Sequence, residues 1–107
     1  MMFINNIVVA AILAASTVTA RNITLCEDPN FVSCRYPEAP VGLCVILPIT
    51  TDTASSLDTG GAPCEFFVDS MCLLASGSFN YTGRIAELGV EPGLELFDDK
   101  ISSFSCQ

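Results

Sequence analysis

Six cysteines in a short chain are the feature that most constrains how this protein can fold. A core of this size is only marginally stable without cross-links, and an even number of cysteines in a short secreted chain is typical of a disulfide framework. We therefore expect three disulfides, and the cysteine count alone leaves their pairing open. The six positions in the 107-residue sequence are Cys26, Cys34, Cys44, Cys64, Cys72 and Cys106.

An apolar leader precedes the first cysteine. Residues 1–20 contain no charged side chain, and Ile7–Ala15 is an unbroken apolar run. The leader ends at Ala20, behind the small and β-branched residues that signal peptidase reads. Because the run is too short to span a bilayer core of about 30 Å, we predict a secretory signal peptide over residues 1–20 and a secreted, extracellular domain over residues 21–107.

The charge of the chain lies wholly in residues 21–107. Twelve acidic residues against four basic ones give a net charge of −8. A surface this acidic repels nucleic acid and anionic membranes, so we expect neither as a partner. It favours cations, basic partners or simple solubility, and we expect a soluble monomer whose target, if it has one, is an extracellular protein or the cell wall.

Short apolar stretches separated by turn residues favour an all-β fold. No segment keeps helical spacing for three turns, so we expect at most one helical turn, near Ile85–Leu88. Strands spaced every 8–12 residues are typical of a sandwich or barrel. The predicted strands are Asn22–Cys26, Cys34–Tyr36, Leu43–Leu47, Ser55–Leu57, Cys64–Val68, Ser78–Tyr81 and Ile101–Cys106.

The chain also repeats itself. Thr51–Leu57 and Asp98–Phe104 share the pattern x-Asp-x-apolar/small-Ser-Ser-apolar, 47 residues apart. Leu25–Asp28 and Phe66–Asp69 match at an offset of 41 residues. The difference between the offsets of 47 and 41 residues fits an insertion in the second half. Two halves of this kind suggest a duplicated four-stranded unit, with Gly60-Gly61 at the joint.

These repeated segments resemble the βγ-crystallin superfamily, specifically its small secreted fungal members. In that family each Greek key opens with two spaced aromatics and a glycine, and closes with Asn/Asp-Asn/Asp-x-x-Ser/Thr-Ser. Asp98–Ser103 matches the closing signature in full, Thr51–Ser56 matches all but its first residue, and Ile23–Phe31 resembles the opening. The resemblance implies two Greek keys, about 21–58 and 63–107, packed as a βγ-crystallin-like β-sandwich.

The opening segments depart from the family pattern. Cys26 replaces the first aromatic, and Ser33 stands where the glycine is expected. In the second motif Cys72 and Leu74 occupy the corresponding positions. Glycine takes a positive φ at little cost, so its loss puts the usual folded hairpin in question. We expect the disulfides to hold these hairpins instead.

The implied Greek keys suggest two of the three disulfides. In a Greek key the fourth strand lies antiparallel to the first, which would bring Cys106 near Cys64. Cys26 and Cys34 flank one hairpin and could pair across it.

The resemblance also implies two calcium sites. In the family a site takes a carbonyl from the third signature position, a hydroxyl from the fifth and an acidic residue from the opening loop of the other key. Calcium prefers six to eight oxygen ligands, so sites with few carboxylates bind it weakly. Asp and Ser at these positions equally form turns without a metal. The implied sets are Thr53, Ser55 and Asp69 for one site, and Lys100, Ser102 and Glu27 or Asp28 for the other.

Catalytic chemistry is poorly represented. The sequence has no histidine, which excludes Ser-His-Asp and Cys-His catalysis and zinc sites that use imidazole. Asp58-Thr59-Gly60 resembles the Asp-Thr-Gly of aspartic proteases, but the residues before it are mostly polar and six cysteines are foreign to that family. We interpret it as the linker between the keys and expect no enzyme.

The function predicted from these features is that of a secreted, non-enzymatic, cysteine-rich domain with weak calcium binding. The alternative is an effector, a killer-toxin-like antimicrobial or a protease inhibitor that acts through an exposed loop, either Thr50–Pro63 or Leu88–Asp98. Asn22-Ile23-Thr24 and Asn80-Tyr81-Thr82 match the N-glycosylation pattern, so Asn22 and Asn80 are candidate glycan sites.

Overall fold

The computed structural model describes residues 19–48 and 53–107. The predicted signal peptide lies outside the described residues up to position 18, as does Asp52 of the first closing signature. All regular structure in the described part consists of strands and short 3₁₀ helices, so the protein is all-β, as predicted.

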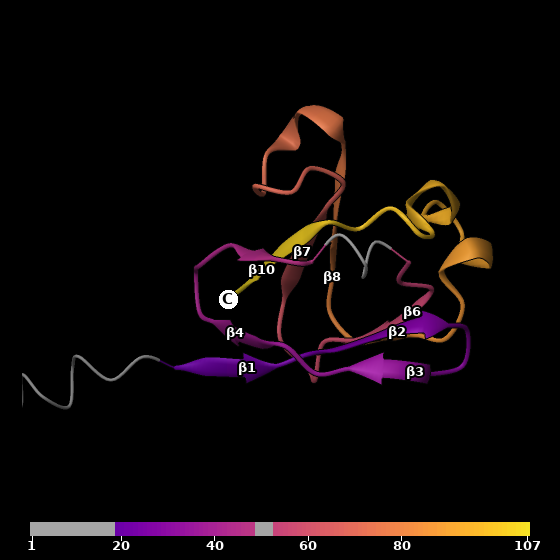
Figure 1. Ribbon diagram of the computed structural model, residues 1–107, viewed down its shortest axis with the longest axis horizontal. Coiled ribbons are helices and arrows are strands. Elements are labelled where there is room, and N and C mark those ends of the chain that lie inside the picture. Colours follow the sequence, from indigo (N-terminus) through magenta and orange to yellow (C-terminus); the bar gives the residue numbers. More distant parts are fainter. Residues whose placement is uncertain (1–18, 49–52) are drawn as a thin grey trace, which may run out of the picture.

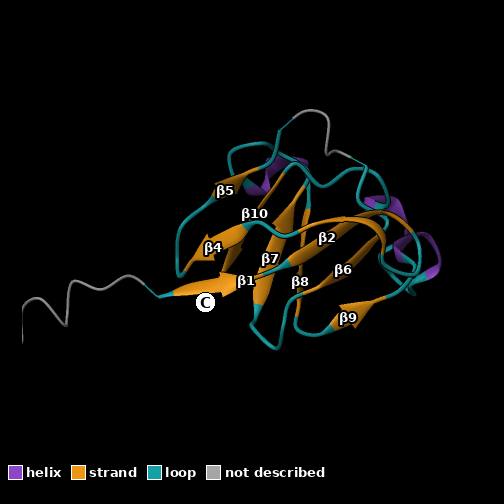
Figure 2. Cartoon of the chain, turned by 60° about the horizontal axis from the view of Figure 1, so that its bottom comes forward, coloured by secondary structure: helices purple, strands orange, loops and turns teal. Residues whose placement is uncertain are grey.

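Two four-stranded antiparallel sheets form the body of the molecule (Figure 1, Figure 2). The first sheet has the order β3 (Val32–Arg35), β2 (Thr24–Asp28), β6 (Ser56–Asp58) and β9 (Arg84–Ile85). The second has the order β5 (Val45–Ile46), β10 (Ser103–Cys106), β7 (Cys64–Phe67) and β8 (Ser78–Tyr81). A third, small sheet pairs β1 (Ala20–Asn22) with β4 (Glu38–Pro40).

The two Greek keys exchange one strand each. In each key the first and fourth strands are neighbours: β2 pairs with β6, and β7 pairs with β10. The third strand of each key crosses to the other sheet, so β9 pairs with β6 and β5 pairs with β10. Because of this exchange neither sheet is complete without the other key, and the two keys fold as one sandwich.

The core lies between the two sheets and draws on both keys. Its largest fully buried side chains include Phe66, Phe104, Leu57 and Ile85. The Phe66 ring stacks on Phe79 at 5.2 Å and on Phe104 at 5.8 Å between centroids. Burial of these apolar side chains is the main favourable term for a domain of this size, and it couples the keys further.

The strand predictions are largely confirmed, since each of the seven predicted strands overlaps an observed one. The predicted helical turn is displaced, because Ile85 pairs with Leu57 in β9 and the turn η3 covers Leu88–Val90 instead. Two further 3₁₀ turns, η2 (Leu74–Ser76) and η4 (Glu95–Phe97), were not predicted. None of the helices in the described part is long and apolar enough to cross a membrane.

Three disulfides connect the six cysteines. Cys26–Cys34 spans the β2–β3 hairpin, and Cys64–Cys106 joins the paired strands β7 and β10. Both pairings are as predicted, Cys64–Cys106 from the Greek-key strand order and Cys26–Cys34 from its position across one hairpin. The third, Cys44–Cys72, links the segment before β5 to the β7–β8 loop and therefore ties the first key to the second.

Candidate functional site

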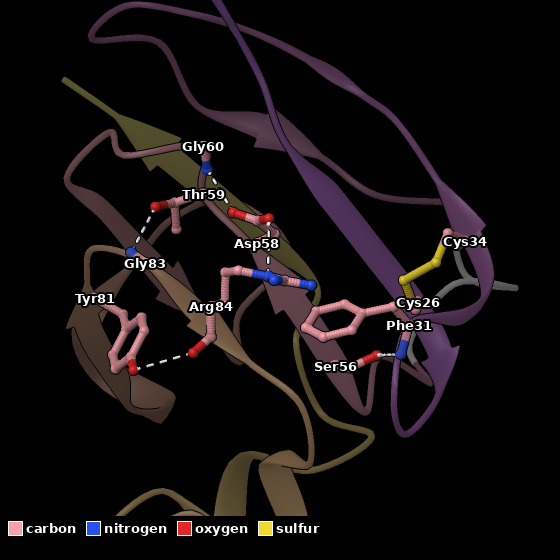
Figure 3. Close-up of polar contacts among 10 residues, drawn as sticks. All are labelled: Cys26, Phe31, Cys34, Ser56, Asp58, Thr59, Gly60, Tyr81, Gly83 and Arg84. Atoms are coloured by element: carbon pink, nitrogen blue, oxygen red, sulfur yellow. Dashed lines mark hydrogen bonds and ion pairs between the residues drawn. A yellow bond between two sulfur atoms is a disulfide. The ribbon is translucent and has the colours of Figure 1, made fainter.

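The hydroxyl of Ser56 holds the opening hairpin of the first key. Ser56 is fully buried at the start of β6. Its Oγ accepts the backbone N–H of Phe31 at 3.1 Å and donates to the carbonyl of Asp28 at 2.7 Å (Figure 3 shows the contact with Phe31). Phe31 has φ 62°, so this clamp fixes a turn conformation that an L residue rarely adopts.

Ser103 does the same in the second key. Its buried Oγ accepts the backbone N–H of Cys72 at 2.9 Å and donates to the carbonyl of Asp69. Cys72 has φ 58°, almost the value at Phe31. Ser56 and Ser103 are 47 residues apart, and their hairpin partners Phe31 and Cys72 are 41 residues apart. These are the two offsets of the sequence repeat, so the repeat reflects one serine-to-hairpin contact that occurs in both keys.

Ser33 and Leu74, which stand at the two expected glycine positions, differ in backbone conformation. Ser33 adopts φ 59°, so it takes the left-handed conformation that glycine would adopt at lower cost. Leu74 does not, because it begins the 3₁₀ turn η2 inside a longer connection between β7 and β8. The folded hairpin survives in both keys without its glycine.

A side chain or a disulfide from the other key braces each hairpin. The Arg84 guanidinium lies 4.4 Å from the centroid of the Phe31 ring, and its Nε is 3.3 Å from Oδ2 of Asp58 (Figure 3). Cys44 is bonded to Cys72. The sequence reasoning missed the role of Arg84, because a lone arginine on a two-residue strand carries no pattern.

Arg84 and Cys44 occupy equivalent positions. Arg84 directly precedes Ile85, which pairs with Leu57, the residue after Ser56. In the same way Cys44 directly precedes Val45, which pairs with Phe104, the residue after Ser103. A cation–π contact and a disulfide therefore perform the same connection in the two halves.

The closing signatures of the two keys meet. Ser55 Oγ donates to Oδ1 of Asp99 at 3.1 Å, and the backbone N–H of Asp99 donates to the carbonyl of Ala54 at 3.1 Å. One oxygen of the neighbouring Asp98, Oδ1, is buried without a hydrogen-bond partner among the described residues. The family resemblance pairs Ser55 with Asp69 and does not predict the contact with Asp99.

Of the other residues in the predicted calcium sets, Thr53 and Lys100 adjoin Ala54 and Asp99 of this contact in the sequence. Asp69 accepts the backbone N–H of Met71 at 2.6 Å, a turn within its own hairpin. Thr53, Lys100, Glu27 and Asp28 are exposed. Within residues 19–48 and 53–107, the side chains of Glu27 and Ser102 make no hydrogen bond or ion pair, and no group of three His, Cys, Asp or Glu residues could hold a metal ion.

Solved structures with the same arrangement are known. A βγ-crystallin from Ciona intestinalis is 26% identical to this chain, with a TM-score of 0.59, and the match covers 80% of this chain and 99% of that one. This chain has the βγ-crystallin fold. A structure described as "Evolution of the eye lens beta-gamma-crystallin domain fold" matches with a TM-score of 0.63 and 17% identity over 86% of this chain and 91% of the other. No family model and no curated protein sequence matches.

The Asp-Thr-Gly segment forms the connection between the keys of this βγ-crystallin fold. Asp58 ends β6, accepts the backbone N–H of Gly60 at 2.8 Å and pairs with Arg84. The buried Thr59 hydroxyl accepts the N–H of Gly83 at 2.8 Å (Figure 3). These contacts shape a turn and leave the Asp58 carboxylate occupied.

The candidate glycan sites are both exposed. Asn22 lies on β1 and Asn80 on β8, at the outer edge of the second sheet. Asn80 pairs across the sheet with Glu65. Glycosylation at these positions stays a prediction.

Proposed function

We propose that this chain is a secreted, non-enzymatic βγ-crystallin-like domain that binds calcium weakly through its closing signatures. Three disulfides in a small domain support an extracellular location, because such bonds persist in oxidising compartments. The net charge of −8 supports binding of a cation over binding of an anion.

The observation that carries the calcium proposal is the contact between the two closing signatures. It brings the Ser55 hydroxyl and the Asp99 carboxylate together, and the adjacent Asp98 has a buried oxygen without a partner among the described residues. Calcium prefers oxygen atoms of this kind, and two carboxylates with one hydroxyl, fewer than the six to eight oxygens of a strong site, support weak binding. Ser55, Asp98 and Asp99 would hold it, with carbonyl oxygens such as those of Thr53 and Lys100 in support. A bound ion would neutralise the carboxylates and connect the two keys.

Thermal unfolding with and without calcium tests this function. At ten times the Kd, a ligand adds about 1.4 kcal/mol of stability, which raises Tm by several degrees in a domain of this size. We expect such a rise in millimolar calcium, and its loss in D99N. E95Q is the matched control, because Glu95 is an exposed acid outside the signatures and its replacement removes the same charge.

Three outcomes would count against calcium binding at this site. One is an unchanged Tm in millimolar calcium. Another is an equal rise in millimolar magnesium, which would indicate screening of a −8 surface rather than a calcium site. The third is an equal loss of response in D99N and E95Q.

Exposed loops favour a second candidate function, in which the domain is an effector, a killer-toxin-like protein or an inhibitor. Of the two loops named from the sequence, Thr50–Pro63 begins outside the described residues, and its described part is wrong as an exposed loop, because Ser56–Asp58 form β6 and residues 54–57 are buried. Leu88–Asp98 exposes Val90 and Leu96. A growth-inhibition assay with the V90S/L96S variant tests whether this segment carries such an activity.

A further inference from the structure

Five large apolar side chains are exposed around the Cys44–Cys72 disulfide. Their exposed fractions lie between 54% and 68%. A contiguous apolar group of a few hundred Å² is about the largest that a monomeric protein exposes, and such groups are often functional. We call this group the staple patch: Leu43, Ile46, Met71, Leu73 and Leu74.

The fold brings these side chains together from two segments. Leu43 adjoins Cys44, and Met71 and Leu73 flank Cys72, so the disulfide joins both sets. Ile46 pairs directly with Ser103, whose hydroxyl binds the N–H of Cys72, so Ile46 lies on the face that the β7–β8 loop covers.

The patch is uncharged within a strongly acidic chain. Residues 39–48 and 70–83, the two segments that supply it, contain no Asp, Glu, Lys or Arg. Asp69 is the nearest acid in sequence to the loop, and its Oδ1 already accepts the N–H of Met71. An uncharged apolar surface on a chain of net charge −8 complements a neutral surface. It does not attract an anionic one.

The size of the patch argues against a second copy of this chain as the occupant. Five side chains that are each more than half exposed offer roughly 300 Å² of apolar surface. A stable protein–protein interface buries about 800 Å² on each partner. Two copies would also bring two charges of −8 together, which repel. Lipid requires no matching partner surface, since apolar side chains enter the boundary between headgroups and acyl chains individually.

We propose that the staple patch docks on a zwitterionic lipid surface, with the Met71–Leu74 loop inserted among the headgroups. The disulfide holds the loop against β5, so the inserted side chains are ordered before binding and little conformational entropy is lost. The proposal shares the extracellular location with the proposed function, but it does not involve calcium.

Flotation with phosphatidylcholine vesicles in EDTA tests the proposal, because EDTA separates it from calcium binding. We expect the wild-type domain to float with the vesicles and binding to be insensitive to salt. The L73S/L74S variant should bind at least tenfold more weakly. V90S/L96S is the matched control: it also replaces two exposed apolar residues, Val90 at 67% and Leu96 at 85%, outside the patch, and should bind like wild type. Mixing in phosphatidylserine should weaken binding.

The proposal is overturned if the wild type does not float, or if L73S/L74S and V90S/L96S lose binding equally. It is also overturned if sedimentation velocity without lipid shows a dimer that L73S/L74S dissolves, because a second copy would then occupy the patch. Equal melting temperatures of the variants confirm that folding is not the cause of any loss.

Discussion

The two Greek keys clamp their opening hairpins identically but brace them differently. In both keys a buried serine hydroxyl binds the hairpin backbone at a residue with φ near 60°. In the first key that residue is Phe31, covered by the Arg84 guanidinium. In the second it is Cys72, bonded to Cys44. The clamp belongs to the fold, whereas the brace is variable.

This difference shows what the fold requires at the position. The cation–π contact and the disulfide are chemically unrelated, but each ties a hairpin of one key to the strand that the other key contributes. The connection between keys is therefore conserved within the molecule. The disulfide closes a sequence separation of 28 residues, while the Arg84 side chain is 66% exposed, so the second hairpin has the stronger brace.

Removing the covalent brace should have the largest effect. Replacement of both Cys44 and Cys72 by alanine is expected to lower the free energy of unfolding by about 2–4 kcal/mol, because the cross-link no longer restricts the unfolded chain. Denaturant unfolding measures the loss, and hydrogen exchange should show faster opening of the β7–β8 loop. A loss no larger than that of R84M would contradict the ranking of the two braces.

Removing either serine clamp should lower the free energy of unfolding by the same amount, but the two hairpins should open to different extents. S56A and S103A each leave a backbone N–H and a carbonyl without a partner, and each should cost about 1–3 kcal/mol. Exchange at the Phe31 amide should accelerate more in S56A than exchange at the Cys72 amide in S103A, since the disulfide still holds Cys72. S102A, measured in EDTA, is the control, because its hydroxyl has no partner in the described part. Equal acceleration in the two keys would show that the braces do not differ.

Much of this comparison could be predicted from the sequence where local patterns repeat. The two Asp-x-x-Ser-Ser segments and their spacing predicted the duplicated unit, and the resemblance they carry implied the sandwich. The order of strands in a Greek key then placed Cys64 opposite Cys106, as the register of β7 and β10 shows. These inferences succeed because each depends on adjacent strands of one key.

The remaining features depend on the exchange of strands between keys. The contact of Ser55 with Asp99, the ring of Phe31 under Arg84 and the Cys44–Cys72 bond all join residues from different keys. No short-range pattern encodes which strand crosses to which sheet. β9 was also missed, because two residues are too few to show alternation, and its place is set by pairing with β6.

The smallest effect should come from the non-covalent brace. R84M keeps much of the packing over Phe31 but removes the cation, so the exposed cation–π contact should cost about 0.5–1 kcal/mol. The ion pair with Asp58 adds at most about 1 kcal/mol, because exposed pairs are screened by water. High salt should therefore destabilise wild type slightly more than R84M. R35M, which removes an exposed arginine with no described ion pair, controls for the change in net charge.

A double-mutant cycle with F31L isolates the brace from these other terms. If Arg84 acts on the hairpin through the ring, F31L and R84M should together cost less than the sum of their separate losses. Additive losses would mean that Arg84 stabilises β6 through Asp58 alone. The first hairpin would then depend on its serine clamp and its own disulfide, and the equivalence of Arg84 with Cys44 would be one of position without a shared role.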